Sequence, residues 1–169
     1  MYSWRITKYN PKYRDERGVY LKDEWTAISD IGKVFDHKLV TFEDYIAVEN
    51  SYVQAILLFV DDLKLPFFLL TCFEDRGLCI NDFYQTIEMV NAYKQIKRKK
   101  IINIENLDVC IRLILREIIW GELKSSGIHV HFGYDYYMFV VSLNKNDAVL
   151  KNIEKLGLFV EEFRSPYID

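Results

Sequence analysis

Two histidines, His129 and His131, are where the sequence comes closest to a chemical site. They alternate with apolar residues in the run Ile128 to Phe132, so on a strand both imidazoles point to one face. Two imidazoles on one face could share a divalent metal such as zinc. No adjoining cysteine or carboxylate completes a ligand set, and Asp135 and His37 are the only obvious further ligands. We therefore expect structural or surface histidines, with no metal and no cofactor.

A second chemical feature is a basic stretch, residues 94–100, that holds five cations within seven residues. Such a cluster could bind the phosphates of DNA or RNA, so the alternative hypothesis is a nucleic-acid-associated protein. Aromatic residues are not interleaved through its second half, and the whole chain is acidic, so we expect a solvated helix end instead. The five cations are Lys94, Lys97, Arg98, Lys99 and Lys100.

The sequence contains no known catalytic motif of the kinds considered. Cys72 stands in an apolar run without a neighbouring cation, so we expect a buried thiol and not a nucleophile. The chain also contains no glycine-rich phosphate loop, no nucleophile elbow and no HExxH pair. We predict that the protein is not an enzyme and has no catalytic residues.

Aromatic and acidic residues gather in segments that we expect to be loops. Tyrosine combines a large apolar area with a hydrogen-bonding tip, and carboxylates complement a basic partner. These properties predict a protein-binding surface, although an aromatic-rich chain shows some such residues by chance. The predicted partner-binding residues are Tyr13, Asp15, Glu16, Asp23, Glu24, Tyr134, Asp135, Tyr137, Glu161 and Glu162.

In size, mild acidity and loop-borne tyrosines and carboxylates, the chain resembles the small bacterial immunity proteins that neutralise a toxin delivered by a neighbouring cell. The segments that carry this resemblance are Phe132 to Tyr137 and Val160 to Tyr167. The resemblance implies tight, stoichiometric occlusion of a protein toxin, expected to be basic and a nuclease. It transfers no functional residue to this sequence.

The totals of the chain set the class of protein. At 169 residues, half of them hydrophobic, we expect one globular domain spanning residues 1–169. A net charge of −3 gives no overall attraction to nucleic acid or to an anionic membrane. Three scattered cysteines, no secretion signal and no apolar run near the ~20 residues of a membrane helix predict a cytoplasmic protein that does not span a membrane. We expect a monomer.

The last forty residues predict one supersecondary unit of strand, strand, helix and strand. Gly133 begins a turn that we expect to use its tolerance of positive φ, and the strand 136–143 is apolar on both faces and should lie between neighbours. Asn144 or Asn146 can cap the helix that follows, and Gly157 suits its C-terminal end.

The remaining elements predict an α+β fold, with a mixed or antiparallel sheet packed against about four helices and the C-terminal ββαβ unit. A strand is expected near residues 2–9, and a helix begins at Thr41, with Asp44 placed for a capping box, and ends before Pro66. A buried strand follows over 66–74. Two further helices are expected, one from Asn81 to the basic stretch and one over 105–124.

Overall fold

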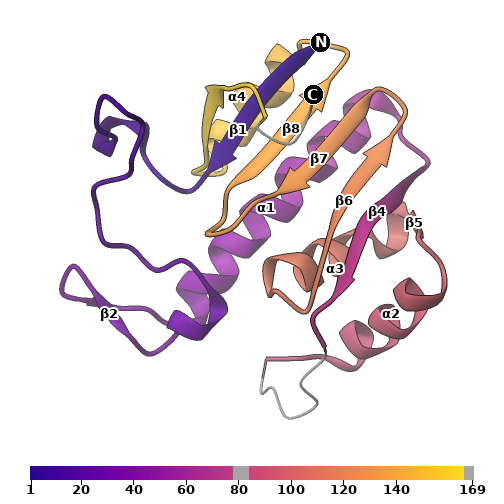
Figure 1. Ribbon diagram of the computed structural model, residues 1–169, viewed down its shortest axis with the longest axis horizontal. Coiled ribbons are helices and arrows are strands. Elements are labelled where there is room, and N and C mark those ends of the chain that lie inside the picture. Colours follow the sequence, from indigo (N-terminus) through magenta and orange to yellow (C-terminus); the bar gives the residue numbers. More distant parts are fainter. Residues whose placement is uncertain (78–83, 166–169) are drawn as a thin grey trace.

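The computed structural model describes residues 1–77 and 84–165, and its centre is a seven-stranded sheet (Figure 1). The strand order is β5-β4-β6-β7-β8-β1-β9, and every pairing among the described residues is antiparallel. Strands from both ends of the chain therefore lie side by side. The strands are β1 (Tyr2–Thr7), β4 (Phe67–Asp75), β5 (Ile101–Asn103), β6 (Ile119–Ser125), β7 (Ile128–Phe132), β8 (Met138–Ser142) and β9 (Phe159–Glu162).

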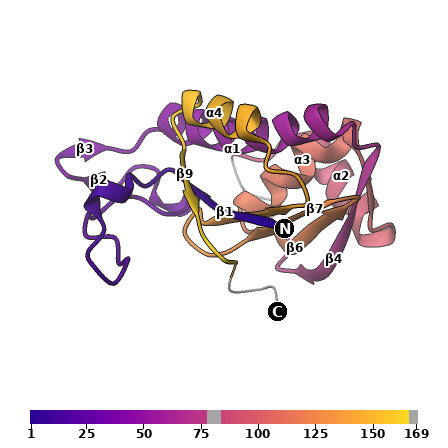
Figure 2. The ribbon, with the colours of Figure 1, turned by 90° about the horizontal axis from the view of Figure 1, so that it is seen from above.

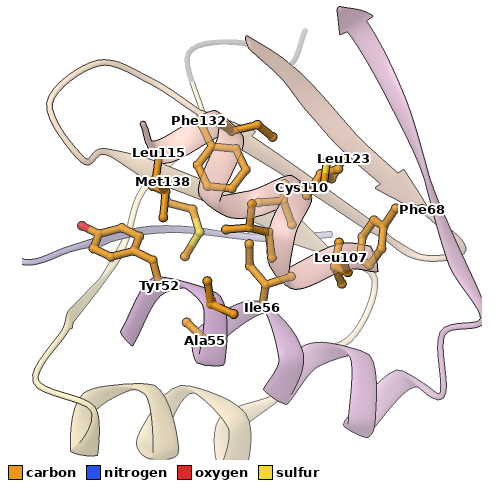
Figure 3. Close-up of a cluster of buried hydrophobic side chains, with 14 of the residues drawn as sticks. Tyr52, Ala55, Ile56, Phe68, Leu107, Cys110, Leu115, Leu123, Phe132 and Met138 are labelled. Carbon is orange, nitrogen blue, oxygen red and sulfur yellow. The ribbon is translucent and has the colours of Figure 1, made fainter. Parts of the chain in front are cut away.

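The helices of the described ranges cover one face of this sheet (Figure 2). They are α1 (Phe42–Leu63), α2 (Ile87–Arg98), α3 (Ile104–Leu115) and α4 (Asp147–Lys155). Figure 3 shows the core between the layers, where α1 contributes Tyr52 and Ile56, α3 contributes Leu107, and the strands contribute Phe132 and Met138. The predicted α+β class, antiparallel sheet and number of helices are confirmed.

Helix α1 begins and ends for the reasons that its sequence predicts. The Thr41 hydroxyl accepts from the backbone N–H of Asp44, and the Asp44 carboxylate accepts from that of Thr41, which completes a capping box. At the other end Lys64 is left-handed and Pro66 follows, so the helix cannot continue. No helix in the described part of the chain is long and apolar enough to cross a membrane.

The predicted helix over 105–124 is wrong in its second half. Helix α3 ends at Leu115, where left-handed Glu117 closes a Schellman-type turn with a bond from the N–H of Ile118 to the carbonyl of Leu113. Strand β6 then occupies the rest of the range. Glycine is the usual residue at the left-handed position, so Glu117 gave no sign that the helix ended there.

The predicted second helix begins later than expected, and it ends within the basic stretch, as predicted. Helix α2 has Thr86 as its N-cap, with the side chain accepting from the N–H of Met89, and the expected cap Asn81 lies outside the described residues. The helix ends at Arg98, and the short strand β5 follows, which the sequence did not predict. Cys79 and Tyr167 also lie outside the described residues.

The C-terminal elements β7, β8, α4 and β9 follow one another in the predicted order. Gly157 is left-handed just after α4, as expected, but Gly133 is not; the positive φ of the β7–β8 turn falls on Asp135 and Tyr136. Strand β9 pairs with β1, which separates it from β8. The four elements therefore do not form a self-contained unit.

A two-residue hairpin, β2 (Val34–Phe35) with β3 (Lys38–Leu39), forms a separate small sheet that the sequence did not predict. Its turn residues Asp36 and His37 are both left-handed, the geometry of a type I′ turn, which usually contains Asn-Gly. Before it, residues 8–33 contain the 3-10 turns η1 (Pro11–Tyr13) and η2 (Ile28–Asp30) and an isolated antiparallel bridge between Arg14 and Tyr20. In Figures 1 and 2 the hairpin projects from one end of the molecule.

Candidate functional site

One hollow that contains predicted partner-binding residues lies between this hairpin, the segment before it and the start of α1. It is a groove of about 500 Å³ whose lining is both acidic and apolar. The carboxylates are Asp23, Glu24, Asp36 and Asp44, and the apolar lining residues are Trp25, Phe35, Leu39, Val40, Ala47 and Val48. Asp23, Glu24 and Asp36 also line an adjoining hollow of about 540 Å³ beside Val34.

Two of the four carboxylates are engaged within the fold. Asp44 binds Lys38 at 2.7 Å, and hydrogen bonds from Lys38 and Thr41 lower the pKa of its carboxyl to about 2. Glu24 accepts from the Tyr20 hydroxyl at 2.5 Å and from Lys8 at 3.4 Å. These contacts fix the walls of the groove.

Asp23 and Asp36 differ from the other two. Both are exposed, and neither forms a hydrogen bond or ion pair from its side chain with any residue in the described ranges. The groove therefore keeps two negative charges that the fold does not use. Sequence reasoning selected Asp23 but missed Asp36, because it did not predict the hairpin.

Two other predicted residues, Tyr137 and Glu161, contact the largely buried side chain of Arg14, and Tyr13 precedes it in the chain. Arg14 donates to the Tyr137 hydroxyl at 2.9 Å, and its Nε lies 3.5 Å from Glu161. Glu161 also binds Arg5 at 2.8 Å, while the Tyr13 ring packs edge-on against Tyr20. Tyr137 and Glu161 thus hold the N-terminal segment against β1 and β9, and their polar atoms are already engaged.

The remaining predicted residues are dispersed. Asp15 accepts from the N–H groups of two following residues and shapes a turn. Glu16 and Glu162 are exposed, as are Tyr134 and Asp135 in the β7–β8 turn, where the Tyr134 ring faces Arg76. The structure therefore brings Asp23 and Glu24 together in the groove, and it brings Tyr137 and Glu161 together at Arg14. Tyr134, Asp135 and Tyr137 line a small cavity of about 30 Å³ at the β7–β8 turn.

The two histidines lie on the sheet face opposite the helices, on either side of Glu122. His129 Nε2 is 3.1 Å and His131 Nδ1 3.3 Å from the Glu122 carboxylate, and Lys124 lies 3.0 Å from it on the same strand. His131 is only 1% exposed, so the cluster is part of the packing. Among the described residues, no group of three or more His, Cys, Asp and Glu could hold a metal ion.

Charge and burial compete in this cluster. Burial would raise the pKa of Glu122, but the hydrogen bond and charge of Lys124, together with His129, lower it to about 2. Burial lowers the pKa of both histidines, against the pull of Glu122. The neutral imidazoles of β7 donate to the carboxylate of β6, and these side-chain hydrogen bonds add to the backbone pairing of the two strands.

Two further features considered in the sequence are Cys72 and the basic stretch, residues 94–100. The predicted burial of Cys72 is wrong: it is exposed and left-handed at a bulge of β4, because the bulge turns its side chain out of the alternation. In the basic stretch, Lys97 pairs with Asp75 at 2.5 Å and Lys100 lies over the Phe73 ring. The other three cations are exposed on α2 or just after it.

Comparisons of the chain with protein-family models, with curated proteins and with solved structures gave no match. The function is therefore argued from the surface of this chain.

Proposed function

We propose that this chain is an immunity protein that binds a cognate bacterial toxin and neutralises it by stoichiometric occlusion, without turnover. The observation that carries the proposal is the acidic groove, in which Asp23 and Asp36 are charged, exposed and unused by the fold. Carboxylates that the fold leaves unpaired, beside apolar walls, suit a basic protein, because charge steers the encounter and apolar contact adds affinity. A nuclease fits this surface, since an enzyme that binds a polyanion presents a basic face of its own.

The alternative, nucleic-acid association through residues 94–100, gains no support from the contacts. Lys97 and Lys100 are engaged by Asp75 and Phe73, which leaves Lys94, Arg98 and Lys99. A steep loss of binding to DNA or RNA with added salt would favour this alternative.

The test of the proposal uses the toxin domain encoded by the reading frame next to this chain's own. We expect the full-length chain to bind that domain one to one and to protect cells that express it. The double variant Asp23→Asn, Asp36→Asn should bind at least about tenfold more weakly, with a smaller dependence on salt.

The matched control is Asp61→Asn with Glu154→Gln, which removes the same charge from exposed positions on α1 and α4. It should bind as the unmodified chain does. Absence of such a reading frame, or a toxin domain that neither binds nor is neutralised, would overturn the proposal.

A further inference from the structure

The β2–β3 hairpin has an unusual position for a pair of strands. It is not part of the seven-stranded sheet, and it projects from one end of the molecule (Figures 1 and 2). A two-stranded hairpin on its own is only marginally stable in water, and folded proteins usually cover or charge such edges. Here the cross-strand residues Val34 and Leu39 are apolar and exposed, at 63% and 52%.

The register shows which backbone groups of the hairpin are open. Phe35 and Lys38 flank the two-residue turn, and the N–H of Val40 donates to the carbonyl of Lys33 at 2.9 Å. Hydrogen-bonded and non-hydrogen-bonded pairs alternate along antiparallel strands. Val34 and Leu39 lie between the pair Phe35–Lys38 and the pair Lys33–Val40, so they form a non-hydrogen-bonded pair. Their N–H and C=O groups point outward, one set at each edge of the hairpin.

The two edges face different surroundings. Leu39 lines the groove together with Asp44, Ala47 and Val48 of α1, so the helix bounds its side. Val34 lines the hollow of about 540 Å³ that is bounded by Lys22, Asp23 and Glu24 and by the turn residues Asp36 and His37. The Val34 edge therefore combines open backbone groups with the two unused carboxylates.

We propose that the partner adds an extended, basic segment to the Val34 edge as a third strand of this small sheet. The inference rests on the proposed function and names how that partner docks. Main-chain hydrogen bonds to Val34 supply affinity, as when a peptide extends an exposed sheet edge. Side chains alternate along the added strand, so one set packs on Val34 while lysines or arginines in the other reach Asp23 and Asp36.

The experiment compares proline variants of the full-length chain in binding to the same toxin domain. Val34→Pro removes the outward N–H and should weaken binding at least about tenfold, because an edge strand tolerates proline only where no hydrogen bond is needed. Val34→Ala keeps the N–H, so its affinity for the toxin domain should fall less than that of Val34→Pro. Leu39→Pro makes the same backbone change on the other edge. Because Leu39 also lines the groove, its own control is Leu39→Ala, and these two variants should bind equally well.

Melting temperature and amide spectra of each variant establish that the fold is kept. In the complex, the amide of Val34 should exchange with solvent more slowly than in the free chain, while that of Leu39 should not change. Unaltered binding by Val34→Pro, or a loss confined to Leu39→Pro, would refute strand addition at this edge and leave the proposed function standing. A toxin domain that does not bind the unmodified chain refutes both.

Discussion

At the residue scale, one buried hydroxyl connects three parts of the fold. The Tyr52 hydroxyl on α1 donates to the carbonyl of Tyr136 at 2.5 Å and accepts from the N–H of Lys8 at 2.9 Å. Tyr136 is left-handed with φ of 61°, a conformation that costs energy for a bulky residue and persists only where neighbours hold it. Tyr52 is therefore a support of the β7–β8 turn.

Replacing Tyr52 with phenylalanine should destabilise the protein by about 1 to 3 kcal/mol, because a buried carbonyl and a buried N–H each lose a partner. Urea unfolding measures the change. Tyr134→Phe is the matched control, since that ring is 70% exposed, and it should stay within about 0.5 kcal/mol. Equal stability of the two variants would mean that the hydroxyl does not support the turn.

At the element scale, α1 and α3 are joined by a buried ion cluster. Glu49 is fully buried and accepts from Arg116 at 2.6 and 2.8 Å and from Arg112 at 2.6 Å. Asp108 binds Arg112 from the same helix at 2.5 Å. The carboxylate partner of these arginines lies more than sixty residues earlier in the chain, so no local pattern in α3 indicates it.

Glu49→Gln should cost about 3 to 5 kcal/mol of unfolding free energy, because it leaves a buried guanidinium without a counter-charge. Denaturant unfolding again gives the value. Glu154→Gln, exposed on α4, should change stability by no more than about 0.5 kcal/mol. A small effect of Glu49→Gln would show that water solvates the Arg116 guanidinium or that another carboxylate balances its charge.

At the scale of the whole molecule, the histidine cluster should make stability depend on pH. Folding lowers the pKa of His129 and His131, so below about 6.5 the unfolded chain takes up protons that the folded protein resists. Stability should therefore fall as pH decreases through this range. Glu122 adds a second loss between 4.5 and about 2, as its carboxylate is protonated.

Unfolding free energies measured from pH 8 to pH 4 test the histidine contribution, with the double variant His129→Gln, His131→Gln for comparison. In the variant, the unfolding free energy should decline much less below pH 6.5. The difference in unfolding free energy between the two proteins at pH 8 reports the change in packing alone. An identical decline in both proteins would place the responsible groups elsewhere.

Elements whose signals are local could be predicted from the amino-acid sequence. The capping box of Thr41 and Asp44, the stop at Pro66, left-handed Gly157 and the alternation around His129 and His131 all depend on neighbouring residues. From them the α+β class and most of the elements could be predicted. Local signals also misled, because Ile119–Ser125 satisfies a helical pattern as well as a strand.

The contacts of each side chain, in contrast, follow from the folded arrangement of the chain. It placed Glu161 against Arg5 and Arg14, Glu49 against Arg116, and Glu122 between the histidines. It also opened a groove beside a hairpin whose turn, Asp36-His37, lacks the usual glycine signal. These contacts join residues far apart in the chain, and their free energy depends on burial and distance, which no local pattern specifies.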